Sequence, residues 1–187
     1  MSVALIAIVS CKNDPKKEVV EEEVKEVEKV VEEVKEARKD IVFSLEPKSD
    51  SKASGKVAIS ESEGHVTLEA KISGLDPGMH AIHIHEKADC SSADGKSSGG
   101  HWNPTFTPHG KWGDKAGFHL GDIGNFEVGE GGIGTVVFTT DQWCIGCGDE
   151  KKDILGKAII VHQGTDDFTS QPSGAAGARV SCGGIIE

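Results

Sequence analysis

The stretch HVTLEAKI, His65–Ile72, alternates polar and apolar side chains along its whole length. Because successive side chains of a β-strand point to opposite faces of a sheet, this period of two predicts a strand with one face against a core. Similar short runs, alternating or β-branched and separated by turn residues, recur along the chain. The strands predicted in this way are Ile41–Glu46, Gly55–Ser60, His65–Ile72, His80–His85, Gly124–Val128, Gly134–Thr140, Ala158–His162 and Arg179–Ile185. Eight such strands predict an all-β fold, an eight-stranded antiparallel Greek-key β-sandwich or barrel of the immunoglobulin-like kind.

Composition agrees with this fold and disfavours some classes of binding partner. Glycine accounts for 24 of 187 residues, which favours turns and loops over a helical bundle. Two long Gly/Ser/Pro-rich stretches, Glu86–His119 and Gln163–Ala178, separate predicted strands, and loops of that length are usually functional or disordered. The formal charge of -11 disfavours nucleic acid and anionic lipid as partners.

The chain before the predicted strands has two further parts. Residues 1–11 contain a short apolar run that ends in Ser10-Cys11, too short to span a bilayer. This pattern is typical of a bacterial lipoprotein signal, which would make Cys11 the lipidation site and attach the protein to a membrane. The alternative is an apolar N-terminus without a function. If the signal is real, the protein is extracytoplasmic, periplasmic or on the cell surface, where disulfides persist.

Residues 12–40 are almost entirely charged residues and valine. Such a segment cannot bury a core, so the predicted domain is residues 41–187. The segment carries a heptad-like stripe of valines at spacings of four and three, formed by Val20, Val24, Val27, Val31 and Val34. About two heptads predict either a solvated, partly helical tether or a short oligomerising zipper.

Histidines gather at predicted strand ends and in the long loops. His83 and His85 are two apart on a strand, so both imidazoles point from one face and could grip one ion. His101, His109 and His119, followed by Asp122, supply three nitrogens and a carboxylate, a set that suits tetrahedral Zn²⁺. A further histidine, His162, could join the first pair in an all-imidazole copper site.

Four motifs resemble the copper/zinc superoxide dismutase family, and the resemblance runs from Ile41 to Ile186. They are GMHAIHIHE at Gly78–Glu86, GHWNP at Gly100–Pro104, HLGDIGN at His119–Asn125 and GARVSCG at Gly177–Gly183. The resemblance implies a dismutase that converts superoxide to O₂ and hydrogen peroxide. It also implies that His83, His85, His101 and His162 bind copper, and that His101, His109, His119 and Asp122 bind zinc. His101 would bridge both ions.

The same resemblance implies roles for residues around the metals. Asp166 would link a copper histidine to a zinc histidine, and His80 would support the copper ligands by packing and hydrogen bonding. Arg179 would hold the superoxide anion beside copper. Cys90 and Cys182 would form a disulfide that clamps the long metal loop to the last strand. His65, in contrast, reads as a surface residue.

Two features depart from the best-known members of the family. Cys144 and Cys147 form a C-x-x-C motif in a Gly/Asp-rich segment, which favours a local disulfide, with an additional metal site or free thiols as alternatives. The loop before Arg179 holds no basic residue, so long-range attraction of superoxide is expected to be weak unless Lys111 or Lys115 supplies it.

Two other function classes fit the same predicted fold. An extracytoplasmic copper-binding or copper-buffering lipoprotein would need the histidines but not Arg179. A structural sandwich used for adhesion would need neither. The complete ligand set together with Arg179 favours the enzyme, and the resemblance leaves open whether it forms a homodimer.

Overall fold

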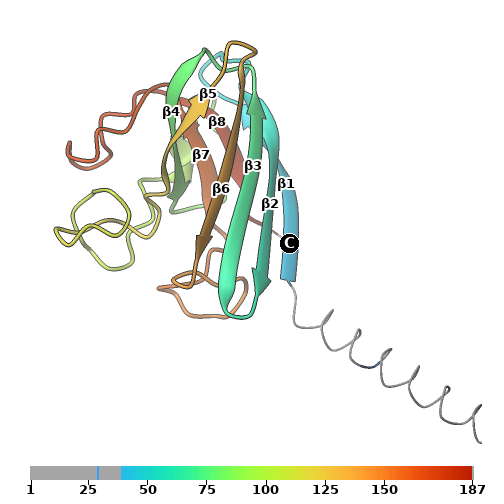
Figure 1. Cartoon of the computed structure of the whole chain (residues 1–187), viewed down its shortest axis with the longest axis vertical. Coiled ribbons are helices and arrows are strands. Elements are labelled where there is room, and N and C mark those ends of the chain that lie inside the picture. The colour runs from blue at the N-terminus through green and yellow to red at the C-terminus, as the bar shows by residue number, and fades with distance from the viewer. Residues whose placement is uncertain (1–28, 30–38, 187) are drawn as a thin grey trace, which may run out of the picture. The chain divides into compact units, whose positions relative to one another are not determined.

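The computed structural model describes Lys29 and residues 39–186 (Figure 1). Its elements in this part of the chain are eight strands and one short 3-10 turn. They are β1 (Lys39–Pro47), β2 (Ser54–Ser62), β3 (His65–Ser73), β4 (Gly78–His85), η1 (Lys96–Ser98), β5 (Gly124–Val128), β6 (Ile133–Thr140), β7 (Ala158–His162) and β8 (Arg179–Gly184). The all-β prediction is confirmed, and the strand ends differ from the predicted ones by at most two residues. The predicted signal, its Cys11 and nearly all of the predicted tether lie outside the described residues.

The strands close into an antiparallel barrel in the order β1-β2-β3-β6-β5-β4-β7-β8, with β8 paired to β1. The neighbours β3 and β6, and likewise β4 and β7, are distant in sequence, which is the Greek-key crossover that the sequence predicts. Pairing of β4 with β7 sets His83 opposite Ile160 and His85 opposite Ala158. The topology therefore brings the histidines of β4 beside the end of β7, where His162 lies.

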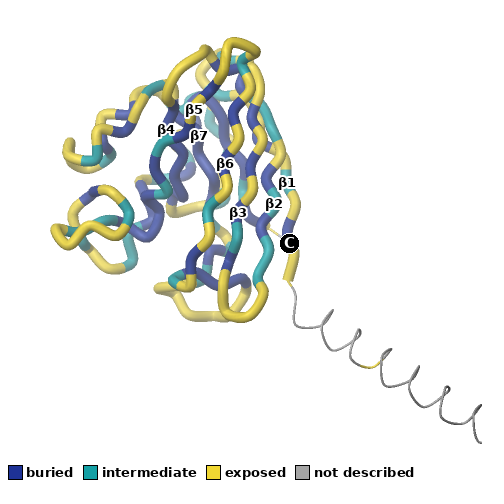
Figure 2. The backbone as a smooth tube through the Cα atoms, viewed as in Figure 1, coloured by how far each residue is buried: buried dark blue, intermediate teal, exposed yellow. Residues whose placement is uncertain are grey.

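The core is built from the alternate positions of the strands. Along β3 the buried residues are Val66, Leu68, Ala70 and Ile72, and the residues between them are exposed or half-buried. Figure 2 shows the same alternation of buried and exposed positions on the neighbouring strands. β7 is different, because all five of its residues are buried. One face of β7 packs in the barrel core and the other is covered, so alternation of exposure is lost in the strand that ends at His162.

Two long connections leave the barrel on the same side (Figure 1). The first links β4 to β5 and the second links β7 to β8. A disulfide between Cys90 and Cys182 joins the first connection to β8. Among the described residues, no helix has the length and apolar character needed to cross a membrane.

Candidate metal centre

The two histidines of β4 are buried and point away from the core residues Ile82 and Ile84. His83 donates from Nε2 to Oδ2 of Asp166 at 2.8 Å, and His85 donates from Nδ1 to the carbonyl of Gly99 at 2.9 Å. The donating nitrogen, Nε2 in His83 and Nδ1 in His85, therefore carries the proton. The other nitrogen of each ring keeps its lone pair. This arrangement fixes ring orientation in the way that metal-binding histidines require.

His101 and His162 complete a first cluster. A β-bridge sets His101 beside His85, and a register irregularity after Val161 turns His162 at the end of β7. The ring centroids of His83 and His101 are 4.0 Å apart, and those of His85 and His162 are 5.6 Å apart. One nitrogen from each of the four rings lies within 4.8 Å of the others. Four imidazole nitrogens at this spacing suit copper.

A second cluster shares His101 with the first. The Nδ1 atom of His101 lies 2.8 Å from Oδ1 of Asp122, that of His119 lies 3.2 Å from the same oxygen, and that of His109 lies 3.0 Å from Oδ2. All four side chains are buried. Three nitrogens and one carboxylate are a closed set for tetrahedral Zn²⁺. His101 contributes Nδ1 here and presents Nε2 to the first cluster.

The unpaired polar atoms of the buried histidines test whether the residues fit metal ions. Among the described side chains, the buried nitrogen and oxygen atoms without a hydrogen-bond partner are His83 Nδ1, His85 Nε2, His101 Nε2, His109 Nδ1, His119 Nδ1 and His162 Nε2. Leaving one such atom buried and unpaired costs about 1–3 kcal/mol, so six at one place need a common explanation. Two bound cations would satisfy every one of them.

Burial sets the protonation of the first cluster. Burial is the largest cause that holds the pKa of His85 and His162 well below the ordinary value, and neighbouring histidines lower it further. Burial also lowers the pKa of His101 to about 4, against a partial opposing effect of Asp122. These rings are therefore neutral at ordinary pH, which is the form that binds metal.

The second cluster behaves differently. Burial alone would lower the pKa of His109, but hydrogen bonds and charge contacts with Asp122 and Asp166 raise it to about 9. Burial would raise the pKa of both carboxyls, yet hydrogen bonds from the histidines hold them well below the usual range. This second cluster, the zinc-type cluster, thus contains one ionised carboxylate, Asp122, and contacts another, Asp166. Their two negative charges would balance a dication.

Asp166 joins the two clusters from outside. Its Oδ2 accepts from His83 and its Oδ1 accepts from Nε2 of His109 at 2.9 Å. The side-chain amide of Asn125 pairs with the main chain of Asp166, donating to its carbonyl and accepting from its N–H. This anchor on β5 explains how one loop carboxylate can be positioned against two histidines.

The side chain of Gln171 forms a second clamp, on the main chain of His109. Its Oε1 accepts from the His109 N–H and its Nε2 donates to the His109 carbonyl, both at 2.9 Å. Sequence reasoning missed Asn125 and Gln171, because a single amide in a loop carries no pattern that marks its partner. It also missed Gly174, where an added Cβ would overlap Asp166.

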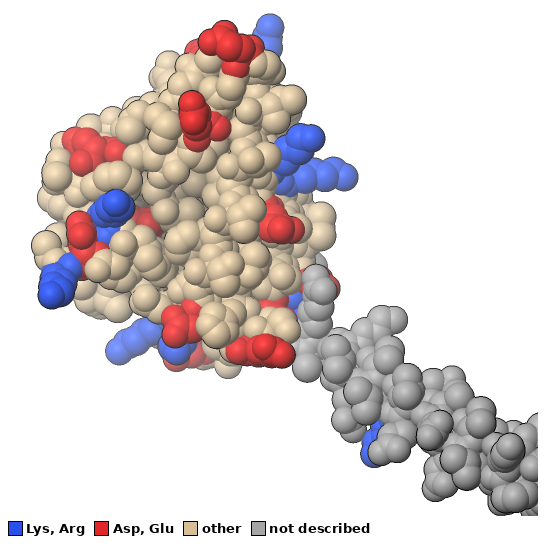
Figure 3. Space-filling model, in the orientation of Figure 1, with Lys and Arg blue, Asp and Glu red and all other residues tan. Residues whose placement is uncertain are grey.

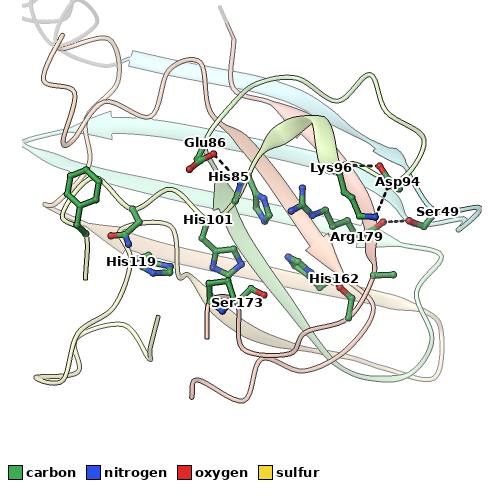
Figure 4. A pocket seen from close by; sticks show the side chains of 16 residues that line it. Ser49, His85, Glu86, Asp94, Lys96, His101, His119, His162, Ser173 and Arg179 are labelled. Carbon is green, nitrogen blue, oxygen red and sulfur yellow. Dashed lines mark hydrogen bonds and ion pairs between the residues drawn. The ribbon is translucent and has the colours of Figure 1, made fainter. Parts of the chain in front are cut away.

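A pocket of about 660 Å³ opens onto the first cluster. Figure 4 shows His85, His101, His162 and Arg179 converging on it. Nη1 of Arg179 donates to the carbonyl of Gly95 at 2.9 Å and to Oγ of Ser98 at 3.1 Å, so the cation is anchored by the loop around η1. Lys96 also lines this pocket, whereas Lys111 and Lys115 do not.

The remaining predicted residues have clear positions. His80 is buried, and its Nδ1 contacts the carbonyl of His162 at 2.9 Å. His65 is exposed. The Cys90–Cys182 disulfide is present, and a second disulfide joins Cys144 to Cys147.

A family model described as copper/zinc superoxide dismutase matches residues 53–185. The chain belongs to the copper/zinc superoxide dismutase family. It is 38% identical over 140 residues to a Cu-Zn superoxide dismutase of Caulobacter vibrioides, covering 73% of this chain and 80% of that protein. It is 35% identical over 142 residues to the superoxide dismutase-like protein YojM of Bacillus subtilis, covering 73% and 71%.

Solved structures agree with this membership. The crystal structure of a SOD-like protein from Bacillus subtilis aligns with a TM-score of 0.68 at 34% identity, over 78% of this chain and 97% of that one. A double mutant of a SOD-like protein from the same organism aligns with a TM-score of 0.69 at 35% identity. The family uses copper and zinc, and the two clusters are the groups among the described residues that fit them. Relatives include both a named dismutase and a dismutase-like protein, so the activity has to be argued from this chain's own site.

Proposed function

We propose that the protein is a superoxide dismutase that acts outside the cytoplasm. His83, His85, His101 and His162 would hold copper, and His101, His109, His119 and Asp122 would hold zinc. The observation that carries the proposal is the His101 ring, which offers one nitrogen to each cluster and lies in a pocket that also contains Arg179. A copper-buffering protein would need the histidines but no anchored cation beside an open copper face.

The chemistry divides between the ions and the side chains. When bound, copper supplies a one-electron couple for converting two superoxide ions and two protons to O₂ and hydrogen peroxide, and zinc supplies a fixed charge. Arg179 binds and orients the small anion by charge and hydrogen bonding. His101, tied on its Nδ1 side, would carry a proton on Nε2 whenever that nitrogen is not bound to copper, and would donate it to the peroxide product.

Asp166 and His80 keep the ligand rings in place during this cycle. Asp166 holds His83 and His109 at once, so movement of one ring is resisted through the other. His80 supports the end of β7 through its contact with the His162 carbonyl. Neither residue lines the pocket next to copper. Both are therefore positioning residues in this proposal.

The proposed location follows from the disulfides. Disulfides form and persist in oxidising compartments and are rare in the cytosol, so the two in this chain support a location outside it. Lipidation of Cys11 would then attach the protein to a membrane. The mass of the mature N-terminal peptide tests this part. A mature chain that starts at an acylated Cys11 supports lipidation, and one that starts at an unmodified residue before Cys11 contradicts it.

Metal analysis combined with a dismutase assay on the full chain tests the activity. We expect one copper and one zinc per chain and rapid turnover of superoxide. His85→Ala should deplete copper and retain zinc, while replacement of Asp122 by Ala should loosen zinc first. Copper bound at full occupancy without turnover would contradict the enzyme and favour the buffer.

A further inference from the structure

The disulfide between Cys144 and Cys147 lies outside the proposed dismutase site. It closes a turn of four residues in the connection between β6 and β7. Neither cysteine lines the pocket that opens onto the first cluster, the copper-type cluster. Neither belongs to a described metal-ligand group. The role of this disulfide therefore has to come from its own surroundings.

The two disulfides differ in how well a solvent thiol can reach them. Cys147 is exposed and Cys144 is 7% exposed, so attack from solvent is possible at the sulfur of Cys147. Cys182 is fully buried at 0%, and Cys90 is half-buried against it. Accessibility is a main determinant of thiol–disulfide exchange, so the pair at 144 and 147 should react first.

The turn is held closed by contacts that do not need the disulfide. The carboxylate of Asp153 accepts from the main-chain N–H groups of Gly146, Gly148 and Leu155, at 2.9 to 3.0 Å. The main chain of Cys144 also pairs with residues 152 and 154. Ile145, between the two cysteines, is 1% exposed and anchors the turn in the core. Opening the S–S bond would therefore leave the turn folded and able to close again.

A short loop also gains little stability from a covalent link. Disulfide stabilisation grows with the length of the closed loop, and here the separation is 3 residues, against 92 for Cys90 and Cys182. A bond that adds little to a turn already held by Asp153 is better explained by its chemistry than by stability.

We propose that Cys144 and Cys147 form a thiol–disulfide exchange site for dithiol reductants, which opens while Cys90–Cys182 stays closed. A reductant thiolate attacks Sγ of Cys147, the S–S bond breaks, and Cys144 leaves as a thiolate that takes a proton. The second thiol of the reductant then attacks the mixed disulfide and releases Cys147. The reductant loses two electrons and becomes a disulfide, and the protein gains two thiols. The Asp149 N–H, 3.5 Å from Sγ of Cys147, stabilises the sulfur as it is released.

The site also has a direct path to the zinc-type cluster. Trp143, next to Cys144, is 2% exposed, and its Nε1 donates to the carbonyl of Leu120 at 2.8 Å. Leu120 lies between His119 and Asp122, two residues of that cluster. Opening the disulfide leaves the turn folded but removes a covalent restraint on Cys144, the neighbour of Trp143. Small shifts of Trp143 would then reach Leu120, so the exchange state should change how firmly this cluster binds zinc.

Thiol mapping on the full, metal-loaded chain tests the exchange site. The protein is equilibrated in buffers with increasing ratios of reduced to oxidised dithiothreitol, alkylated and analysed by peptide mass. We expect alkylated Cys144 and Cys147 at ratios where Cys90 and Cys182 remain unlabelled. In the matched control, the double variant Cys144→Ser with Cys147→Ser, Cys90 and Cys182 should also remain unlabelled over that range. Simultaneous labelling of all four disulfide cysteines, or labelling of Cys90 first, overturns the proposal.

Zinc transfer tests the path through Trp143. The reduced protein is freed of dithiothreitol without air, and its zinc is titrated against a chromophoric chelator beside the oxidised form. We expect affinity to be lower by a factor of about 5 in the reduced form, near the lower end of coupling between protein sites. Trp143→Phe keeps an aromatic ring but removes the donor, so its two redox forms should differ less. Equal affinities in the two forms of the unaltered chain overturn the path, and neither measurement depends on dismutase activity.

Discussion

His101 can serve two clusters because each of its nitrogens faces a different set of partners. Nδ1 lies against Asp122, while Nε2 is buried without a partner among His83, His85 and His162. In three copper-type rings the other nitrogen is tied to Asp166 or to a main-chain carbonyl, which leaves the inner nitrogen bare. Protein contacts on the outside of the rings thus decide which atoms can bind metal.

Arg179 is the residue for which a substitution most directly tests substrate binding. Arg179→Ala should lower kcat/KM by roughly tenfold or more, since a hydrogen bond to a charged group contributes about 1.5–3 kcal/mol. Both metals should stay bound, because the side-chain hydrogen bonds of Arg179 go to Gly95 and Ser98 and not to a described ligand. Arg179→Lys keeps the charge and should retain part of the rate. Unchanged kinetics of the alanine variant, with full metal content, would remove the proposed role.

Gln171 is expected to support the zinc-type cluster through the His109 main chain. Gln171→Leu removes two hydrogen bonds of 2.9 Å, and each is worth about 1 kcal/mol, so zinc affinity should fall by up to about thirtyfold. Gln171→Glu keeps the acceptor and loses the donor, so its loss should be smaller. A chelator competition assay measures both. Wild-type zinc affinity in the leucine variant would show that the clamp does not position His109.

At the scale of elements, the strands were predictable and the loops were not. Alternation in β3 and its neighbours identifies them from the sequence, because each strand has one buried face. The spacing of His83 and His85 on one strand face likewise predicts a shared ion. The pairing of Asn125 with Asp166, and of Gln171 with His109, could not be predicted, because it depends on how two irregular loops fold against each other.

Gly174 shows how closely the second long connection approaches the clusters. Its φ is +66°, and an added Cβ would overlap Oδ1 of Asp166 and lie 2.7 Å from Nε2 of His109. Gly174→Ala should therefore displace Asp166, weaken zinc binding and lower the melting temperature by several degrees, since strain and a broken contact together exceed about 1 kcal/mol. Gly64→Ala is the matched control, because its φ is +75° with nothing within 4 Å. Equal effects of the two variants on zinc would contradict the close-approach argument.

For the whole molecule, charge opposes the approach of an anionic substrate. Residues 41–187 hold 12 basic and 20 acidic side chains, a net charge of -8. Figure 3 shows acidic and basic side chains interspersed on the visible face, with wide uncharged areas between them. In the pocket, Lys96 is paired with Asp94 at 3.0 Å, and Glu86 also lines it, so Arg179 provides most of the local attraction.

This charge distribution predicts a weak dependence of the rate on ionic strength. Arg179 attracts superoxide at short range, where salt screens the attraction little. Salt also screens the repulsion of superoxide by the surrounding negative charge, which offsets part of the loss. We expect kcat/KM to fall only modestly between about 10 and 150 mM salt, a span over which the Debye length drops from about 30 to 8 Å. Pulse radiolysis over this range measures it. A steep fall would show that other cations, such as Lys111 or Lys115, guide superoxide.

The metal-free protein should be most stable near the ordinary pKa of histidine, about 6.5. The pKa of His101 is lowered to about 4 in the folded state. Between about pH 6.5 and 4 the unfolded chain therefore binds a proton that the folded chain does not bind, and stability falls as the pH drops through this range. His85 and His162 act in the same direction. The pKa of His109 is raised to about 9, so the folded chain holds an extra proton and stability falls as pH rises from about 6.5 to 9. Bound zinc would replace the extra proton of His109, so the loaded protein should lose the slope above about pH 6.5. Its slope below about pH 6.5 should be steeper, because the unfolded histidines bind protons that the metal-bound rings refuse. Urea unfolding of both forms at several pH values measures this, and a metal-free protein that gains stability steadily up to pH 9 would contradict it.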